Sequence, residues 1–242
     1  MASVLWTALK SLFYPQMCPM CGAYVGEQKE QGQLCDKCLL SLPRTEQAAL
    51  RENSTEMELL SGYSSMSVAK KKMHIDRAAA FLFFEKDHPL REAIHKMKYA
   101  NRPQIGYYLG KQAAYEMQYA EFFDGIDVII PIPLHRNRFR SRGYNQSEYI
   151  ARGLSEVTGI PLDKTHVTRE RNTPQQALQT QEGRKTNVVG AFAVNHPEQL
   201  YRKHILLVDD LLTTGETMRA CIQALRPIRG AKFSVFALCK AR

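Results

Sequence analysis

Two adjacent carboxylates followed by a hydroxyl-rich turn are the feature of this sequence most suited to chemistry. The stretch HILLVDDLLTTGET (204–217) places Asp209 and Asp210 after an apolar run and then brings three threonines around Gly215. A helix that starts after such a turn offers free N–H groups and the positive end of its dipole to an anion. The stretch therefore favours a ribose 5-phosphate, with the acids at the sugar hydroxyls and the turn around the phosphate.

Three other interpretations of this stretch stand beside the first. The acids could hold Mg²⁺, or they could be solvated at a strand end before an ordinary N-capped helix. A response-regulator acidic pair is a weaker competitor, because such a pair has no need of the threonines. The sequence lacks G-x-x-x-x-G-K-[ST] and G-x-G-x-x-G, so neither a nucleoside triphosphatase nor a dinucleotide enzyme is supported.

A dense cationic group follows the apolar stretch DVIIPIP (127–133). Its members are His135, Arg136, Arg138, Arg140 and Arg142. Such a group suits a diphosphate, because guanidinium groups neutralise phosphate charge and bind its oxygens in pairs. A nucleic-acid backbone would also suit it, and the whole chain is basic, with 33 Lys and Arg against 24 Asp and Glu. We therefore expect an anionic ligand or partner.

Four cysteines form a separate motif near the N-terminus. They occur as two C-x-x-C pairs in CPMCGAYVGEQKEQGQLCDKC, namely Cys18, Cys21, Cys35 and Cys38. Two such pairs present four thiolates from tight turns, which is the donor set of a structural Zn²⁺ site with no position left for water. Two disulfides or an iron–sulfur cluster are the alternatives. The lack of an export signal disfavours the first, and the symmetric spacing gives no support to the second.

The elements that must position these residues alternate along the chain. Strands are predicted at 78–86, 127–133, 190–194, 204–210 and 232–239, and helices at 88–102, 103–123, 145–159 and 217–230. The cationic stretch after residue 133 is expected to be a loop. This alternation predicts an α/β fold with a mostly parallel sheet flanked by helices, whose ligands lie beyond the carboxyl ends of the strands.

Two domains are expected. Residues 1–60 should hold an amphipathic helix, the zinc module and a connector, and residues 61–242 the α/β domain. The helix is predicted from the spacing of Leu5, Leu9, Leu12 and Phe13. No segment approaches the roughly 18 apolar residues of a membrane span, and the N-terminus has neither a basic leader nor a small-residue cleavage site. We therefore expect a cytoplasmic protein.

The stretch VDDLLTTGET closely resembles the phosphoribosyl-diphosphate signature of type I phosphoribosyltransferases. The resemblance implies that Asp209 and Asp210 contact the ribose hydroxyls in the catalytic site, and that Mg²⁺ accompanies the diphosphate. It also implies a 5-phosphate loop formed by Thr213, Thr214, Gly215, Glu216 and Thr217. The fold implied is that of the type I phosphoribosyltransferases.

Together with the cysteine motif, the stretches PLHRNRFRSRGYNQSEYIA and TPQQALQTQEGRKTNVVGAF resemble the ComF family of competence-associated proteins. That resemblance implies diphosphate contacts from the cationic group and a mobile hood that brings Gln176, Arg184 and Asn187 toward the diphosphate. Lys96 and Lys98 could add charge to the site, although exposed helix lysines are commoner.

The resemblance also implies a function in DNA uptake, natural transformation or DNA processing, with phosphoribosyl diphosphate as ligand and single-stranded DNA or DNA-uptake proteins as partners. We expect transfer of ribose 5-phosphate to an unidentified acceptor. The alternative is a non-catalytic, nucleic-acid-handling accessory factor that uses the fold as a ligand sensor. Whether the chain forms a homo-oligomer is left open.

Overall fold

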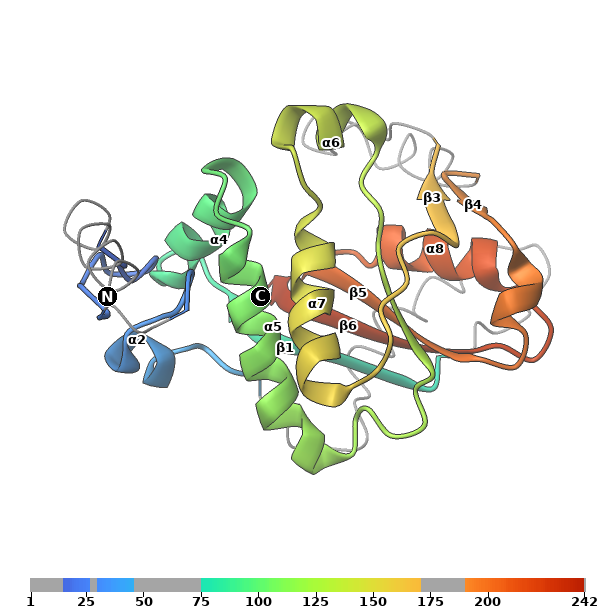
Figure 1. Cartoon of the computed structure of the whole chain (residues 1–242), viewed down its shortest axis with the longest axis horizontal. Helices are drawn as coiled ribbons and strands as arrows, with labels where there is room; N and C mark the ends of the chain where they lie inside the picture. Colours follow the sequence, from blue (N-terminus) through green and yellow to red (C-terminus); the bar gives the residue numbers. More distant parts are fainter. Residues whose placement is uncertain (1–14, 27–29, 46–74, 171–189, 242) are drawn as a thin grey trace, which may run out of the picture.

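Apolar stretches form the central sheet of the protein, whose computed structural model describes residues 15–26, 30–45, 75–170 and 190–241. The strands of this sheet are β1 (Arg77–Phe84), β2 (Val128–Pro131), β5 (His204–Leu212) and β6 (Lys232–Ala241). They are hydrogen-bonded in the order β1-β6-β5-β2, and all three pairings are parallel (Figure 1). The predicted parallel sheet is therefore confirmed, and the carboxyl ends of β2 and β5 meet at one edge.

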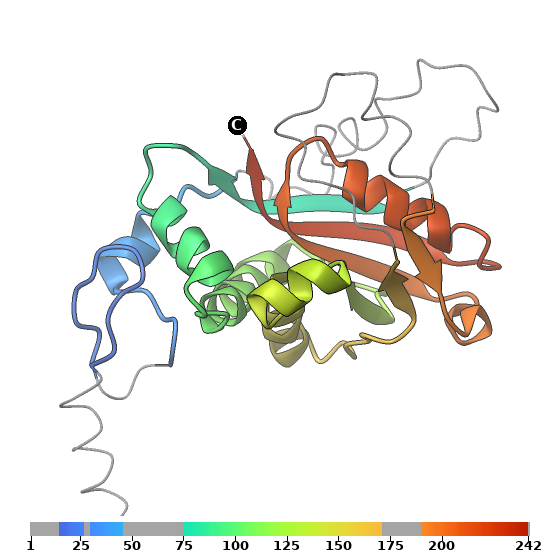
Figure 2. The ribbon, with the colours of Figure 1, turned by 90° about the horizontal axis from the view of Figure 1, so that it is seen from above.

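Alternate residues of these strands face opposite sides of the sheet, and each side has its own apolar core. On one side, Leu206 and Phe236 share a core with buried residues of α4 (Leu90–Tyr99), α5 (Gln104–Met117) and α7 (Gln146–Thr158). On the other side, Leu207 and Val235 share a core with α8 (Glu216–Leu225). The view from above shows α8 on one face of the sheet and α5 and α7 on the other (Figure 2). The helices therefore flank the sheet as predicted.

The caps and the glycines of α5 and α7 explain how these helices form and pack. Asn145 caps α7 by accepting a hydrogen bond from the N–H of Ser147, and Gly159 ends the helix in the left-handed conformation. A Cβ on Gly110 would lie 2.3 Å from the carbonyl oxygen of Ile150. Only glycine allows α5 and α7 to approach so closely. A short 3-10 helix, η2 (Gln118–Ala120), follows α5.

Two parts of the chain differ from the sequence-based prediction. The cationic stretch after β2, expected as a loop, forms the helix α6 (Arg136–Arg142), with His135 accepting a hydrogen bond from the N–H of Asn137. The predicted strand at 190–194 forms β4 (Phe192–Val194) outside the main sheet. It pairs antiparallel with β3 (Val167–Arg169), which sequence patterns did not predict. The 3-10 helix η4 (Pro197–Leu200) follows β4.

The N-terminal module, residues 15–26 and 30–45, lies at one end of the molecule beside α4 (Figures 1 and 2), and its residues 43–45 hydrogen-bond to the edge strand β1. It contains the one-turn helix α2 (Asp36–Leu40). Met20, Leu34 and Leu42 belong to the same core as α4 and α5. The module is therefore packed against the α/β domain.

Several predicted features lie outside the described residues. They are the amphipathic helix with Leu5, Leu9, Leu12 and Phe13, most of the connector, the domain boundary at residues 60 and 61, and the hood residues Gln176, Arg184 and Asn187. In the described ranges, no helix combines the length and apolar character that crossing a bilayer requires.

Candidate functional site

Asp209 and Asp210 lie at the carboxyl edge of the sheet, in a strand that continues to Leu212, two residues further than predicted. The carboxylate of Asp209 accepts hydrogen bonds through Oδ1 from Ser147 Oγ at 3.0 Å and from the N–H of Asp210 at 2.9 Å. Oδ2 of Asp210 lies 3.0 Å from Nζ of Lys98. Separate helices therefore hold the two acids, α7 through Ser147 and α4 through Lys98.

The acid pair has unusual electrostatics. Burial, together with the charge of Asp210, raises the pKa of Asp209 to about 7, although the two hydrogen bonds and the charge of Lys98 act to lower it. Burial alone would lower the pKa of Lys98, but the charge and hydrogen bond of Asp210 and the charge of Asp209 outweigh it and raise that pKa. Near neutral pH, Asp209 is therefore partly protonated beside a charged lysine.

The turn of residues 213–215 joins β5 to α8 at the same edge of the sheet. Thr213 and Thr214 are exposed, and Gly215 is buried with a φ of 71°. Gly215 is the N-cap residue of α8, and as a glycine it has no side chain to cap the first N–H groups of this ten-residue helix. The turn therefore has the features of an anion site at a helix N-terminus.

A cavity of about 350 Å³ lies beside the acid pair and the turn. This volume is within the range of small-molecule sites in proteins. All seven residues of the predicted sugar and 5-phosphate site line it, namely Asp209, Asp210, Thr213, Thr214, Gly215, Glu216 and Thr217. The end of β2, α6 and the start of α7 supply other parts of the wall. The structure therefore brings these predicted residues together around one space.

The helical form of α6 divides the predicted cationic group. Arg138 and Arg142, four residues apart and so on one face of the helix, line the cavity. Arg136 and Arg140 are exposed and lie outside the lining. His135 uses Nδ1 to cap α6. A role for Arg184, outside the described residues, stays a prediction.

Arg169 and Gln146 line the cavity, although sequence reasoning assigned neither of them to the site. Burial and the charge of Arg138 lower the pKa of Arg169, and the charge of Asp209 partly offsets them. Gln146 is 1% exposed, and its Nε2 has no hydrogen-bond partner among the described residues. Gln146 directly follows the helix cap Asn145, and this position at the start of α7 could have indicated that its side chain lies near the site. The three-residue strand that carries Arg169 has too few residues to show a pattern.

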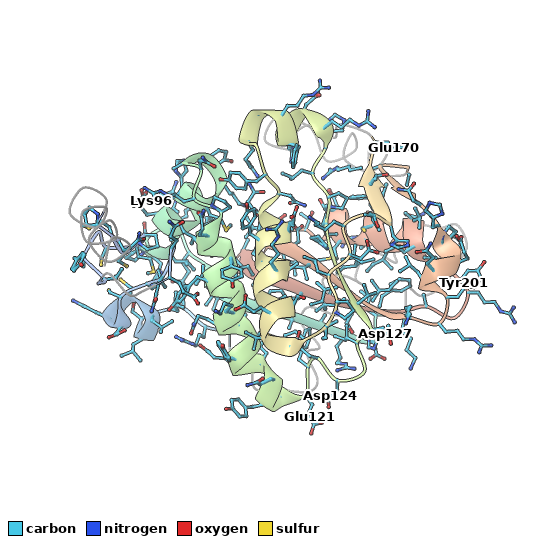
Figure 3. All side chains as sticks on the ribbon, viewed as in Figure 1. Lys96, Glu121, Asp124, Asp127, Glu170 and Tyr201 are labelled. Carbon is cyan, nitrogen blue, oxygen red and sulfur yellow. The ribbon has the colours of Figure 1, made fainter. Side chains whose placement is uncertain are left out.

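Lys96 and Lys98, both predicted as possible sources of positive charge at the site, contact different parts of the protein. Lys98, with 17% of its side chain exposed, pairs with Asp210. Lys96 lies on the part of α4 that faces the N-terminal module (Figure 3), where its Nζ donates to the carbonyl oxygen of Pro19 at 3.0 Å. Only Lys98 of the two is therefore part of the cavity wall.

The four cysteines of the N-terminal module form one cluster, with all four sulfur atoms within 4.8 Å of one another. Sγ of Cys21 and Sγ of Cys35 are 3.7 Å apart. Tetrahedral zinc with Zn–S bonds of about 2.3 Å would place its sulfurs about 3.8 Å apart. Burial raises the pKa of Cys18, but N–H donors from Cys21, Cys35 and Met20 outweigh it and lower that pKa to about 7. The cluster is compatible with a metal site.

Comparison with known proteins finds a matching family model and several similar individual proteins. The family model described as phosphoribosyl transferase domain matches residues 140–242, a range that includes the acid pair and the turn. The chain is 34% identical over 155 residues to "DNA utilization protein YhgH" of Shigella flexneri, which covers 63% of this chain and 67% of that protein.

Two competence proteins also match. "Competence protein F" of Haemophilus influenzae is 35% identical over 117 residues, which cover 48% of this chain and 51% of that protein. "Competence protein ComFC" of Bacillus subtilis is 30% identical over 115 residues, which cover 47% of this chain and 45% of that protein.

Proposed function

The chain belongs to the ComF family of competence-associated proteins and has its phosphoribosyltransferase domain, and from this premise we propose that it binds phosphoribosyl diphosphate with Mg²⁺ in the cavity beside Asp209 and Asp210. We propose further that it transfers ribose 5-phosphate to an unidentified acceptor. The names of the relatives support a role in DNA uptake or processing.

The observation that carries this proposal is the acid pair beside the start of α8, whose N-cap residue is the glycine Gly215. Phosphate suits the helix start, because N–H groups and the dipole attract an anion there. The carboxylates of Asp209 and Asp210 would repel phosphate but would accept hydrogen bonds from hydroxyl groups. Ribose 5-phosphate carries a phosphate, which suits the helix start, and hydroxyl groups, which suit the carboxylates of Asp209 and Asp210.

The cationic wall supports a diphosphate on the same ligand. Arg138 and Arg142 line the cavity from α6, and Arg169 lines it from β3. Guanidinium groups bind phosphate oxygens in pairs and stay charged at any working pH. Nε2 of Gln146, which has no hydrogen-bond partner in the described ranges, adds a buried donor that an anionic oxygen in the cavity could satisfy.

The donor sets of the chain fit the two proposed metals. Proteins hold Mg²⁺ through one or two carboxylates together with substrate phosphates, and Asp209 and Asp210 would supply the carboxylates. When bound, Mg²⁺ neutralises charge on the diphosphate. The sulfur spacing of the four cysteines fits Zn²⁺, and with every position taken by sulfur that ion would stabilise the N-terminal module without reacting.

The proposed transfer breaks the bond between C1 of the ribose and the diphosphate, and positive charge develops on the sugar. The carboxylates of Asp209 and Asp210 would hold the sugar hydroxyls and place negative charge near that developing charge. Ser147 orients Asp209 through the hydrogen bond to Oδ1, and the arginines would hold the departing pyrophosphate. The chain's contribution is therefore positioning and electrostatic stabilisation.

Pyrophosphate release tests this function. The protein should release pyrophosphate from phosphoribosyl diphosphate and Mg²⁺ when a suitable base or amine is supplied, and the Asp209→Asn/Asp210→Asn double variant should not. Binding without release across a broad acceptor panel would contradict the transfer step.

The second candidate is a non-catalytic, nucleic-acid-handling accessory factor that uses the fold as a ligand sensor. The relatives named for DNA utilization and competence favour it, and the net charge of +9 is consistent with it. A salt titration of single-stranded DNA binding separates the candidates, because phosphate contacts weaken steeply with salt. Absence of binding at low salt would rule out direct nucleic-acid contact.

A further inference from the structure

The N-terminal module contacts α4 at the turn that presents two of the four sulfurs. Nζ of Lys96 donates to the carbonyl oxygen of Pro19 at 3.0 Å. Pro19 lies between Cys18 and Cys21 in the chain, so this hydrogen bond ends inside the first cysteine turn. Met20 of the same turn belongs to the core that contains the buried residues of α4. The position of α4 is therefore linked to the conformation of the first cysteine turn.

The three residues that follow Lys96 contact three different segments around the cavity. These contacts are Met97 O with Tyr144 Oη at 2.5 Å, Lys98 Nζ with Asp210 Oδ2 at 3.0 Å, and the Tyr99 ring with Arg142 Cζ at 5.1 Å. The last turn of α4 therefore joins the module to the start of α7, to the acid pair on β5 and to the cationic helix α6. A displacement of this turn would disturb three parts of the cavity wall, namely α6, the start of α7 and the acid pair.

We infer that metal bound at the four cysteines regulates ligand binding in the cavity, with α4 transmitting the effect through Lys96 and Lys98. The inference rests on the proposed binding of phosphoribosyl diphosphate. Without metal, the four sulfurs lose the bonds to a shared ion, and the first cysteine turn opens more readily. Lys96 then loses its acceptor, and Lys98 is no longer held against Asp210. The acid pair, without its counter-ion, repels a polyanionic ligand more strongly.

Such coupling must be reciprocal. If metal at the cysteines raises the affinity for the ligand, the ligand must raise the affinity for the metal by the same factor. Couplings between sites in proteins are typically about 5–150-fold, and the contacts through one helical turn lead us to expect about tenfold. Metal affinity therefore reports on this link without any measurement of turnover.

The experiment titrates Zn²⁺ into the full chain against a zinc-selective indicator, with and without phosphoribosyl diphosphate and Mg²⁺. In the unmodified protein the ligand should raise zinc affinity about tenfold. Lys96→Met should still bind zinc and the ligand, because Lys96 lines neither the cavity nor the cysteine cluster, but its ligand affinity should fall toward that of the zinc-free protein and the increase in zinc affinity should be lost. Lys111→Met is the matched control. It removes ion pairs with Glu30 of the module at 2.7 Å and with Glu156 of α7 at 3.0 Å but leaves α4 untouched, so the increase should persist.

Calorimetric titration of the ligand into the same samples separates the possible failures. If the zinc-loaded protein binds phosphoribosyl diphosphate but its zinc affinity does not change, the inference is wrong and the proposed function stands. The inference is also wrong if Lys96→Met retains the full increase, or if Lys111→Met loses it as completely as Lys96→Met. If the zinc-loaded protein does not bind phosphoribosyl diphosphate, the proposed function and the inference are both overturned.

Discussion

Lys98 and Asp210 form an ion pair of 3.0 Å between the last turn of α4 and the end of β5, with side chains only 17% and 15% exposed. The pair joins segments more than a hundred residues apart in the sequence. It also places a fixed positive charge next to two adjacent carboxylates.

Ligand affinity should rise with pH around neutrality. Burial and the charge of Asp210 raise the pKa of Asp209 to about 7, and only its ionised form can accept hydrogen bonds from ribose hydroxyls at both oxygens. Binding of ribose 5-phosphate should therefore strengthen as pH rises through about 7. Because Lys98 lowers this pKa, Lys98→Met should move the rise to higher pH. Calorimetric titrations across pH measure both effects, and a rise at the same pH in the variant would contradict this role of Lys98.

The same raised pKa predicts an unusual stability effect. An unfolded aspartate has a pKa of about 3.9, so between that pH and about 7 the folded protein binds the extra proton at Asp209. Stability therefore falls as pH rises through this window, and the loss is complete above it. Asp209→Asn removes this titration, so at about pH 8 the ligand-free variant should melt several degrees higher than the unmodified protein, at about 2–4 °C per kcal/mol.

Melting curves at several pH values check this expectation, and the difference should shrink toward pH 5, near the lower end of the window. Asp124→Asn is the control, because Asp124 is an exposed acid on a loop remote from the cavity (Figure 3). An Asp209→Asn protein no more stable than the unmodified one at pH 8 would show that Asp209 is not destabilising when ionised.

The two faces of α6 should differ in ligand binding. Arg138→Met should weaken binding of phosphoribosyl diphosphate by about 10–100-fold, as expected for the loss of charge-assisted hydrogen bonds. Ribose 5-phosphate, which has no diphosphate, should bind this variant almost normally. Arg136→Met removes the same charge from the exposed face and should have little effect on either ligand. Equal losses in both variants would indicate long-range attraction instead of a contact in the cavity.

The cysteine cluster should contain one zinc ion per chain in freshly purified protein, as a four-sulfur site requires. Cys21→Ser should lose this metal and lower the melting temperature, because the N-terminal module shares its core with α4 and α5. Cys221→Ser is the control for metal content and should keep the zinc ion, since Cys221 is a buried residue of α8 and does not belong to the cluster. Metal content well below one ion per chain would contradict the zinc assignment.

Much of the fold could be predicted from local sequence patterns. The apolar run of β5 and the capping signals of α7, Asn145 and Gly159, each lie within a few residues of the feature they specify. The helix α6 could not be predicted from the cationic stretch, because four arginines in seven residues show no apolar face. β3 has three residues and no periodicity, so its pairing with β4 could not be predicted.

The site was predictable where one continuous segment forms it. The acids and the turn lie in ten consecutive residues, and the cysteines lie in two short pairs with informative spacing. Lys98, Arg169 and Gln146 reach the cavity through three different elements, and only the folded chain brings them together. Lys96 and Lys98 look alike in sequence, and the helix directs one to the module and the other to the acid pair.

A crystal structure with phosphoribosyl diphosphate and Mg²⁺ would test the central proposal most directly. We predict the 5-phosphate at the turn of residues 213–217, the ribose hydroxyls against Asp209 and Asp210, and the diphosphate beside Arg138 and Arg142. A ligand bound in the opposite orientation, with its 5-phosphate at α6, would contradict the assignment of the acid pair to the sugar. So would a cavity that stays empty at saturating ligand.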